Sequence, residues 1–483
     1  MAVLEGLKPA AVFKYFEEIC SIPHGSRNTK QISDYLKSFA EARSLKVIQD
    51  ESNNIIIKKP GTAGYEDHPT VIIQGHMDMV CEKEEDCGID FEKDGLTLEV
   101  KDGKVSAKGT TLGGDDGIAV AYALAILDAD DIPHPPLEVV ITVDEEIGML
   151  GAAALDGSVL EGRVLLNVDS EDEGHILCSC AGGATIVAAL PVEIESDSGY
   201  EVWFSVDKLT GGHSGIEIIK GTANANVVIG RILYELNETV SMRLISLSGG
   251  LKDNAIPRAA EARLLLDTEG DVKEFAERIA QIKEVIGHEL QKTDPEFDLH
   301  IAMGVEKKKK KAMTYESTRL AIAGLHLLPA GIQKMSKDFP GLVQTSLNLG
   351  VLESDIREVR YSFCVRSSVS SEKEELIGRI RCLMDVLGGT VKVESDYPSW
   401  EYRDESKLRD IMAATYRELY GSEPVLEAVH AGVECGIFAG KLEGLDAVSF
   451  GPDLKDIHTT RETLDIASAQ RTWEYLLEVL KRL

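Results

Sequence analysis

A histidine and an aspartate stand two residues apart in the stretch VIIQGHMDMV, residues 71–80. The apolar, β-branched residues before them predict a strand, and side chains at positions i and i+2 of a strand point to the same face. His76 and Asp78 are therefore expected side by side at the carboxyl end of a strand, where open α/β sheets place their sites. One imidazole nitrogen of His76 can bind a metal while Asp78 orients the other. Taken alone, so short a motif is more often a buried histidine paired with an aspartate.

Carboxylates follow further apolar runs in the first third of the chain: Asp115 and Asp116 in TLGGDDG, Glu145 and Glu146 after LEVVITV, and Asp169 after VLLN. Each is an ordinary loop acid by itself, and Asp116 is also a candidate N-cap for a helix beginning near Gly117. Parallel strands, however, would gather these carboxylates with His76 at one sheet edge, where they would repel one another unless cations offset the charge. Their recurrence therefore favours a metal site.

A second candidate ligand stands near the end of the chain, where His458 lies in GPDLKDIHTTRE after the short apolar run AVSF. If TTRE opens a helix, this stretch is simply a cap region. Alternatively, His458 is a metal ligand that returns to the sheet of the first domain. The residues alone leave both interpretations open.

Length and charge limit the class of protein. The chain has 483 residues and a formal net charge of −31, from 82 acidic and 51 basic side chains. This length exceeds what one hydrophobic core usually supports, so we expect two or more domains. The negative charge would repel nucleic acid and anionic membranes, and we expect neither as a partner. The chain has no run of about 18 apolar residues and begins with an amphipathic helix, so neither a membrane span nor a signal peptide is expected.

The eight cysteines are scattered, and two of them form the motif CxC at Cys178 and Cys180. This spacing is unlike that of a small disulfide scaffold or a CxxC site. We therefore expect reduced thiols and a cytoplasmic protein.

The pattern of elements changes twice along the chain. Up to residue 183, helices and strands alternate as in a βαβ sheet, and this style returns after residue 396. Between them, alternating strands and helices indicate an antiparallel sheet with helices on one face. We expect an α/β fold in which a first domain with a mainly parallel mixed sheet flanked by helices (1–183 and 396–483) is interrupted by an inserted α+β domain (184–395). The lysine run 307–311 is expected to be a solvated loop.

The spaced motifs resemble those of the zinc-dependent clan of dipeptidases, carboxypeptidases and aminoacylases. They are GHMDMV, GGDDGIAVA, TVDEEIGMLGA, NVDSE, GGHSG, NAIPR, HAGVECG and GPDLKDIHTTRE. Within this clan the chain most closely resembles the aminoacyl-histidine (Xaa-His) dipeptidases, and ICSIPHGSRNT near the amino terminus also fits that group. The resemblance spans residues 8–480 with the motifs in the same order.

The resemblance implies a pair of zinc ions, with cobalt or manganese as substitutes. Asp115 would bridge the two ions. His76 and Asp169 would complete the site of one ion, and Glu146 and His458 the site of the other.

The resemblance also implies the catalytic roles. Glu145 would be the general base that takes a proton from water, and Asp78 would orient His76. This division of labour explains the two consecutive glutamates, because Glu146 is taken up by metal while Glu145 stays unligated to carry the proton. A cis peptide bond between Asp115 and Asp116 is implied as well.

Four residues resemble substrate-binding positions of the family, and three of them lie in the inserted domain, which the resemblance implies is a lid or dimerisation domain beside the catalytic domain. His213 in GGHSG would stabilise the oxyanion, often from the partner subunit of a dimer. Asn254, Arg366 and Gly432 would hold the terminal carboxylate of the substrate. The competing interpretations are that Arg366 braces a strand and that His213 caps a helix.

The expected activity is hydrolysis of dipeptides with a free amino end, including Xaa-His dipeptides, by a homodimer that associates through the inserted domain. A carboxypeptidase, a tripeptidase and an N-acyl amino acid hydrolase of the same clan are the alternatives. A dinuclear phosphatase or nuclease is disfavoured because the acidic chain lacks a basic phosphate cradle. A binding module without catalysis is disfavoured because Glu145 is present.

Overall fold

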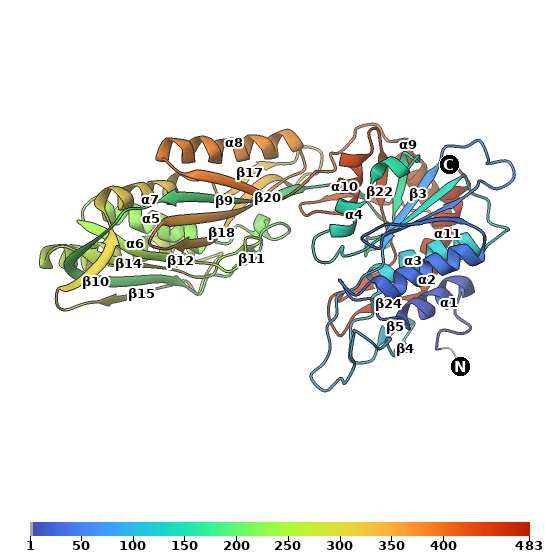
Figure 1. Cartoon of the computed structure of the whole chain (residues 1–483), viewed down its shortest axis with the longest axis horizontal. Coiled ribbons are helices and arrows are strands. Elements are labelled where there is room, and N and C mark those ends of the chain that lie inside the picture. The colour runs from blue at the N-terminus through green and yellow to red at the C-terminus, as the bar shows by residue number, and fades with distance from the viewer. Residues whose placement is uncertain (1–2) are drawn as a thin grey trace. The chain divides into compact units, whose positions relative to one another are not determined.

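The computed structural model describes residues 3–483, which form two compact units. The discontinuous unit comprises Met1–Cys180, Tyr402–Ala428 and Val433–Leu483, and the inserted unit comprises Ala181–Glu401 and Val429–Gly432 (Figure 1). Within residues 3–483, no helix has both the length and the apolar character needed to cross a membrane.

An eight-stranded mixed sheet organises the discontinuous unit, in the order β1-β2-β6-β3-β7-β22-β8-β21. Its central strands are parallel, since β3 pairs in parallel with β6 and β7, and β22 pairs in parallel with β7. The outer pairs β1–β2, β2–β6 and β22–β8 are antiparallel. The strands are β1 Lys46–Gln49, β2 Ile55–Lys59, β3 Val71–His76, β6 Leu137–Thr142, β7 Val164–Asn167, β8 His175–Cys180, β21 Val425–Val429 and β22 Asp446–Ser449. The predicted mixed sheet with a mainly parallel centre is confirmed.

The register brings the carboxyl ends of the four central strands to one edge. His76 lies opposite Thr142, Gln74 lies opposite Asn167, and Asn167 lies opposite Ser449. All residues of β3 and β6 are buried, which explains their nearly continuous apolar sequences. The segments that follow these strands therefore start from neighbouring points.

The helices of this unit are α1 Ala10–Cys20, α2 Lys30–Ala42, α3 Gly114–Asp128, α4 Leu150–Ala154, α9 Lys407–Tyr420, α10 Glu434–Lys441 and α11 Ile466–Leu480. The helix α3 packs between α1 and β3 and is buried along almost its whole length, as its Ala- and Leu-rich sequence predicts. Glycine at position 75 permits this close approach, because a Cβ atom there would lie 2.7 Å from Cβ of Ala119.

A small sheet in the order β23-β24-β5-β4 positions the last candidate ligand. Its strands are β4 Leu98–Lys101, β5 Lys104–Ala107, β23 Leu454–Lys455 and β24 Thr463–Asp465. The segment 456–462 connects β23 to β24, and α11 begins only after β24 with Asp465 as its N-cap. The interpretation of TTRE as a helix start is therefore wrong, because a strand follows it.

The inserted unit contains a ten-stranded antiparallel sheet. Its main path is β15-β10-β14-β12-β18-β19-β9-β20, with β16 beside β10 and β17 beside β18. The strands are β9 Gly182–Pro191, β10 Ile194–Asp207, β12 Met242–Gly249, β14 Ala260–Leu266, β15 Asp298–Met303, β16 Lys308–Met313, β17 Gly331–Met335, β18 Val343–Ser354, β19 Glu358–Ser367 and β20 Thr390–Tyr397. The helices α5 Ala225–Asn237, α6 Glu269–Leu290, α7 Tyr315–Leu327 and α8 Ser370–Leu387 contact one another in series on one side of this sheet (Figure 1), as predicted.

Two halves with the same strand order meet within this sheet. Half A consists of β10, α5, β12, β14, α6 and β15, and half B consists of β9, α7, β18, β19, α8 and β20. From its outer strand inward, each half has its last, first, third and second strand in that order. The halves join where β12 pairs antiparallel with β18, an arrangement expected of two similar bodies related by a twofold axis.

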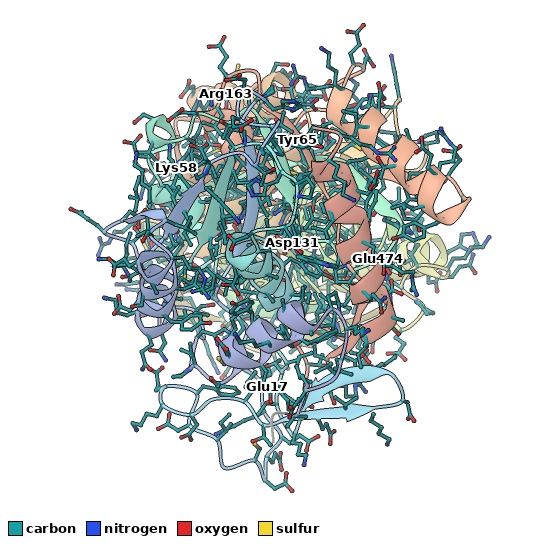
Figure 2. All side chains as sticks on the ribbon, turned by 90° about the vertical axis from the view of Figure 1, so that its right-hand side faces the viewer. Glu17, Lys58, Tyr65, Asp131, Arg163 and Glu474 are labelled. Carbon is teal, nitrogen blue, oxygen red and sulfur yellow. The ribbon has the colours of Figure 1, made fainter. Side chains whose placement is uncertain are left out.

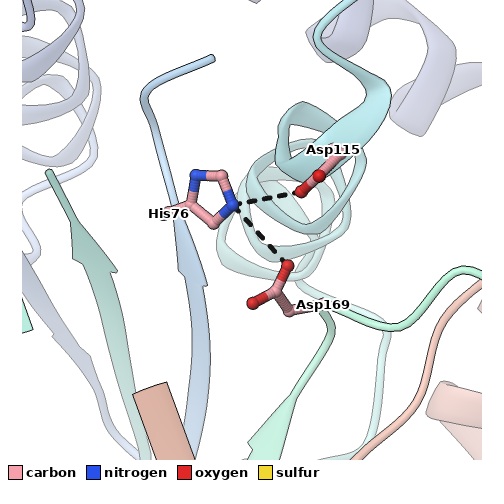
Figure 3. A group of neighbouring side chains, drawn as sticks. All are labelled: His76, Asp115 and Asp169. Carbon is pink, nitrogen blue, oxygen red and sulfur yellow. Dashed lines mark hydrogen bonds and ion pairs between the residues drawn. The ribbon is translucent and has the colours of Figure 1, made fainter. Parts of the chain in front are cut away.

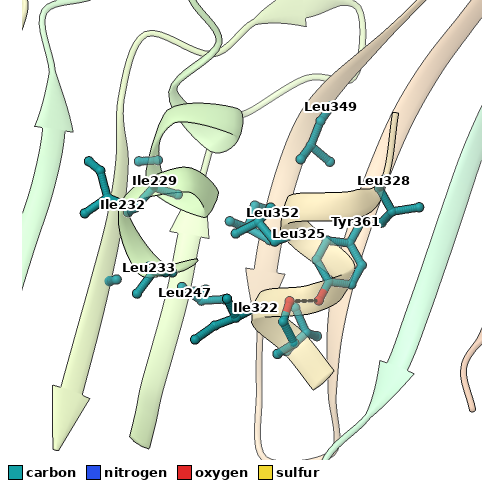
Figure 4. Close-up of a cluster of buried hydrophobic side chains, with 14 of the residues drawn as sticks. Ile229, Ile232, Leu233, Leu247, Ile322, Leu325, Leu328, Leu349, Leu352 and Tyr361 are labelled. Carbon is teal, nitrogen blue, oxygen red and sulfur yellow. Dashed lines mark hydrogen bonds between the residues drawn. The ribbon is translucent and has the colours of Figure 1, made fainter. Parts of the chain in front are cut away.

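The core of the inserted unit is continuous across this junction. Helices α5 and α7 pack side by side, and their leucines and isoleucines contact those of β12 and β18 (Figure 4). The buried hydroxyl of Tyr361 donates to the carbonyl of Ala321 at 2.9 Å, which ties β19 to α7. The two halves therefore share one core.

The prediction of a loop at residues 307–311 is wrong, because most of this lysine run forms β16. That strand pairs with the start of β10, which carries Glu195 and Asp197. The Lys310 ammonium lies 2.6 Å from a carboxylate oxygen of Glu201, and Ala312 and Met313 anchor the end of the strand in the core. Acidic residues on the neighbouring strand offset the lysine charge, which composition alone does not reveal.

Candidate metal centre and anion-binding group

Five predicted ligands come together in the discontinuous unit from five segments. His76 is the last residue of β3, Glu146 and Asp169 follow β6 and β7, Asp115 lies at the start of α3, and His458 lies between β23 and β24. The predicted gathering at one sheet edge is thus observed for the segments after the parallel strands. Asp115 reaches the same place by the packing of α3 on β3.

One group is formed by His76, Asp115 and Asp169 (Figure 3). Nε2 of His76 lies 3.1 Å from Oδ1 of Asp115 and 3.6 Å from Oδ1 of Asp169. The imidazole is almost fully buried, with 1% of the residue exposed. Three ligand atoms of two chemical types therefore face a common point.

The second group shares Asp115 and adds Glu146 and His458. Nε2 of His458 lies 3.1 Å from Oδ2 of Asp115 and 3.0 Å from Oε2 of Glu146. Asp115 thus turns one carboxylate oxygen toward each imidazole. This is the geometry required of a carboxylate that bridges two cations.

The spacing and chemistry of both groups fit divalent metal ions. Ligand atoms about 2.1 Å from a tetrahedral zinc ion would lie about 3.4 Å from one another, and the ligand pairs described above are 3.0–3.6 Å apart. Within residues 3–483, the carboxylates of Asp115, Glu146 and Asp169 form ion pairs only with the two imidazoles. So many buried acids are costly unless positive charge is supplied.

The pKa values of these residues reflect the same crowding. Burial acts to lower the pKa of His76, but hydrogen bonds to its aspartate neighbours outweigh it and raise the pKa well above its usual value. Hydrogen bonds to Asp115 and Glu146 raise the pKa of His458 to about 10. Burial raises the pKa of Asp169 to about 6. Without a cation the acids thus retain protons on the imidazoles, where metal ions would otherwise bind.

Asp78 faces Nδ1 of His76 with both its backbone carbonyl and its carboxylate. Nδ1 of His76 lies 2.9 Å from the backbone carbonyl of Asp78 and 3.5 Å from its carboxylate. The carboxylate accepts from the Ser26 hydroxyl at 2.8 Å, from the N–H of Glu145 at 3.0 Å and from the N–H of Glu146 at 3.4 Å. Asp78 therefore orients the imidazole through its carbonyl, with its carboxylate also within ion-pair distance, and holds the turn that carries both glutamates.

Glu145 is the adjacent acid that stays outside both ligand groups. Within residues 3–483, its carboxylate forms no hydrogen bond or ion pair that would hold it in place. Burial raises its pKa well above the usual value, and the neighbouring carboxylates of Asp169, Glu434 and Glu146 add to this effect. An unligated acid with a raised pKa next to a metal centre has the properties of a general base.

The peptide bond between Asp115 and Asp116 is cis, as the resemblance implies. The Asp116 carboxylate accepts from the backbone N–H of His76 at 3.1 Å and makes no capping hydrogen bond to α3. The prediction of Asp116 as an N-cap is therefore wrong, because its side chain turns toward β3. It supports the strand that carries His76.

A buried polar row beneath the centre was not predicted from the sequence. Glu434, at the start of α10, accepts hydrogen bonds from Gln74 and from the hydroxyl of Thr142. Asn167 in turn donates to Gln74 at 2.6 Å. Burial raises the pKa of Glu434 to about 8. The available signal was the presence of polar residues within otherwise apolar strands.

In the inserted unit, local contacts determine the tautomer of His213. It lies in β11 (Gly212–His213), which pairs with β13 (Ala255–Ile256). Its Nδ1 accepts from the backbone N–H groups of Gly215 and Ile216 at 3.2 and 3.3 Å. Burial and the nearby Arg366 guanidinium lower its pKa, which favours the neutral ring. Nε2 therefore carries the hydrogen and can donate it to an anion.

Arg366 on β19 has the features of an anion-binding residue. It is 7% exposed, its Nη1 donates to the Tyr397 hydroxyl at 2.9 Å, and its Nε has no hydrogen-bond partner within residues 3–483. No ion pair to a carboxylate is formed there either. A buried guanidinium in this condition is suited to a carboxylate ligand, which can accept two parallel hydrogen bonds.

His430 is a third member of this group that the sequence analysis missed. It is 3% exposed, and its Nε2 lies 2.7 Å from the Ser346 hydroxyl. Burial, with Arg366 and His213 nearby, lowers its pKa to about 3, so the ring is neutral. The sequence does carry a signal for it, because His430 opens the motif HAGVECG that also contains Gly432.

The other two predicted substrate residues are less enclosed. The Asn254 side chain is exposed, while its carbonyl accepts from the Ser214 N–H at 2.9 Å beside His213. Gly432 is half-buried in the segment Val429–Gly432. The structure therefore places Arg366 and His213 near His430, while the Asn254 side chain is exposed.

Comparison with known proteins is consistent with this geometry. The chain is 35% identical to the cytosol non-specific dipeptidase of Escherichia coli (strain K12) over 485 aligned positions, which cover 100% of this chain and 99% of that protein. Among solved structures, the aminoacylhistidine dipeptidase of Vibrio alginolyticus matches with a TM-score of 0.89 and 34% identity, over 99% of this chain and 98% of that one. The fold is also that of aminopeptidase PepT from Bacillus cereus, at a TM-score of 0.56 and 16% identity over 98% of each chain.

The family model for peptidase family M20/M25/M40 matches residues 72–482, a range that contains all five candidate ligands and the four predicted substrate residues. With this match and the full-length identity above, the chain belongs to peptidase family M20/M25/M40.

Proposed function

We propose that this chain hydrolyses the peptide bond of dipeptides with a free amino terminus, Xaa-His dipeptides among them, with the help of two zinc ions. The observation that carries the proposal is the Asp115 carboxylate, whose two oxygens each face a separate group of histidine and acid. The names of the E. coli and V. alginolyticus relatives support the substrate class. Their similarity extends over nearly the whole chain.

The residues of the discontinuous unit divide the work of amide hydrolysis. When bound, the two cations would polarise the scissile carbonyl and make water a stronger nucleophile near neutral pH. Glu145 takes the proton from that water and returns it to the leaving amine. Asp78 fixes the turn on which Glu145 lies and orients His76. Glu146, one residue further, is held against His458 and is not available as a base.

The residues of the inserted unit recognise the substrate. His213 presents an Nε2–H that can donate to the oxyanion formed at the attacked carbonyl. Arg366 binds the terminal carboxylate, and the neutral His430 and the Tyr397 hydroxyl line the same place. Asn254 and Gly432 contribute further polar contacts to that carboxylate. We propose these roles because, within residues 3–483, neither the His213 imidazole nor the Arg366 guanidinium forms an ion pair with a carboxylate.

A substrate scan tests the proposed activity. Free dipeptides, tripeptides, N-acyl amino acids and a phosphodiester are incubated with the zinc-loaded protein, and kcat/KM is measured for each. Dipeptides are expected to give the highest value, because the two relatives that match over nearly the whole chain are named as dipeptidases. A higher value for tripeptides or N-acyl amino acids would replace this proposal with that activity, and phosphodiester cleavage would exclude a peptidase. Parallel assays with cobalt and manganese determine whether zinc is the preferred metal.

We also propose that two chains associate through the inserted unit, and that each chain nevertheless supplies its own substrate-binding residues. His213 of β11 and Arg366 of β19 belong to the inserted unit of one chain, and the Arg366 guanidinium, after burial, helps to lower the pKa of His213. The inner edge strand of half A, β12, is already paired with the inner edge strand of half B, β18. A partner is therefore not needed to bring these two residues together.

A mixing experiment tests that arrangement. His213→Ala and Arg366→Ala chains, each with a different tag, are expressed alone and together, and each variant alone is expected to lose about 10²- to 10³-fold in kcat/KM. If each site uses residues of one chain, co-expressed chains that copurify stay as inactive as the single variants. If the histidine comes from the partner, mixed dimers purified through both tags contain one intact site out of two and recover about half of the wild-type activity. Such a recovery would contradict the proposal.

The name of the E. coli relative places that protein in the cytosol, and we propose the same location for this chain.

A further inference from the structure

Glu462 binds the loop that carries the shared ligand Asp115. Its Oε2 accepts from the backbone N–H groups of Leu112 at 2.8 Å and Gly113 at 3.2 Å. Its Oε1 accepts from those of Gly114 at 2.8 Å and Asp115 at 3.4 Å. The residue is 2% exposed. One carboxylate thus satisfies four consecutive backbone donors at the start of α3.

The loop is shaped for this carboxylate. Gly113 has φ of +67°, a left-handed conformation that turns consecutive N–H groups toward one side. A Cβ atom at Gly114 would lie 3.2 Å from Oε1 of Glu462 and 2.7 Å from the Leu454 side chain. The two glycines of TLGGDDG therefore allow the Glu462 carboxylate to come close to the backbone of this loop. A negative charge at this helix start is also favoured by the helix dipole.

Glu462 belongs to the same segment as His458, a ligand of the second group. Within this segment the Thr459 hydroxyl donates to the carbonyl of Asp456 at 2.7 Å, and the Glu462 N–H donates to the carbonyl of Thr459 at 3.2 Å. Immediately after Glu462, β24 pairs with β5. The segment is therefore tied at both ends, and Glu462 is its connection to the Asp115 loop.

We propose that Glu462 is a positioning residue that sets the distance between Asp115 and His458 and thereby the metal affinity of the second ligand group. This inference rests on the proposed metal-dependent function. Glu462 is no ligand in either group, yet it links two segments that are 347 residues apart in sequence at Asp115. Losing this link leaves the two ligand-bearing loops free to shift, and a metal ion tolerates little shift of its ligands.

Glu138 is a matched control in the same unit. It is 1% exposed, and its carboxylate accepts from the backbone N–H groups of Glu161 and Gly162 at 3.0 Å each. It also pairs with Lys58, labelled in Figure 2, at 2.6 Å. Glu138 is near the amino end of β6, four residues before Thr142, so about 13 Å of strand separates it from the catalytic edge.

The test compares Glu462→Gln with Glu138→Gln in zinc affinity, measured by competition with a chelator, and in kcat and KM. Glutamine keeps the volume but replaces one acceptor oxygen by an NH₂ group that faces backbone donors. Glu462→Gln is expected to weaken binding of one zinc ion by about 10- to 100-fold, with kcat falling more than KM changes. Glu138→Gln is expected to stay within about threefold of wild type. If Glu462→Gln does not fold, Glu462→Asp retains the charge and withdraws it by one methylene.

Hydrogen exchange supplies a readout that needs no metal. In the metal-free protein, the amides of residues 112–115 are expected to exchange at least about tenfold faster in the Glu462 variants than in wild type. Unchanged exchange together with wild-type zinc affinity would overturn the proposal, as would an equal loss of affinity in Glu138→Gln. A wild-type protein that binds no zinc would refute the proposed function, while faster exchange in the variants would still support the link from Glu462 to the loop.

Discussion

Glu145→Gln is expected to lower kcat for dipeptide hydrolysis by about 10²- to 10⁴-fold, the usual contribution of a general base, with two zinc ions still bound. The amide cannot accept the proton of water, and the Glu145 side chain belongs to neither ligand group. Because Asp78 binds the backbone N–H of Glu145, the turn should keep its shape in the variant. The measurements are kcat with a saturating dipeptide and zinc content after equilibrium dialysis.

Asp144→Asn is the control for this prediction. Asp144 is the preceding residue on the same turn, and its carboxylate accepts from the Arg27 N–H at 2.6 Å, away from both ligand groups. Its φ of +55° suits asparagine as well as aspartate. Asp144→Asn is therefore expected to retain kcat within about threefold. Wild-type turnover in Glu145→Gln, or an equal loss in Asp144→Asn, would remove Glu145 from the role of base.

Asp115→Asn is expected to weaken binding of both zinc ions, each by more than about 100-fold, and to abolish activity. Losing a neighbour of a ligand already costs about 10- to 100-fold in metal affinity, and here a charged ligand shared by both groups is removed. Oδ1 and Oδ2 of Asp115 face His76 and His458 respectively, so no single-site variant of the other acids should have this double effect. Zinc stoichiometry at buffered free zinc concentrations measures it.

Asp169→Asn is the comparison variant for Asp115→Asn, because it removes a ligand that only one group uses. Asp169 contributes only to the group with His76. Its replacement is expected to weaken the binding of one zinc ion and to leave the other ion bound with wild-type affinity. Two tightly bound ions in Asp115→Asn, or loss of both ions in Asp169→Asn, would contradict the assignment of Asp115 as the bridge.

Much of the fold follows from local patterns that the sequence displays. Runs such as VIIQGH and LEVVIT form buried parallel strands because β-branched apolar residues suit a sheet covered on both faces. The different sequence pattern between residues 183 and 396 corresponds to an antiparallel sheet whose strands alternate along the chain with helices. Predictions from local patterns were wrong where a distant segment determined the outcome. The lysine run forms a strand because it pairs with β10. The Asp116 side chain does not cap α3 because it accepts a hydrogen bond from the backbone N–H of His76.

The sequence by itself determined which chemical groups are available and that most of them follow strands: two histidines, a set of acids and a pair of consecutive glutamates. Only the tertiary structure decided that the backbone carbonyl of Asp78 faces His76 and that His430 lies near Arg366. It also decided that Glu462 binds the Asp115 loop. The physical reason is that side-chain type is a local property, whereas distances and hydrogen-bond partners depend on how segments hundreds of residues apart pack together.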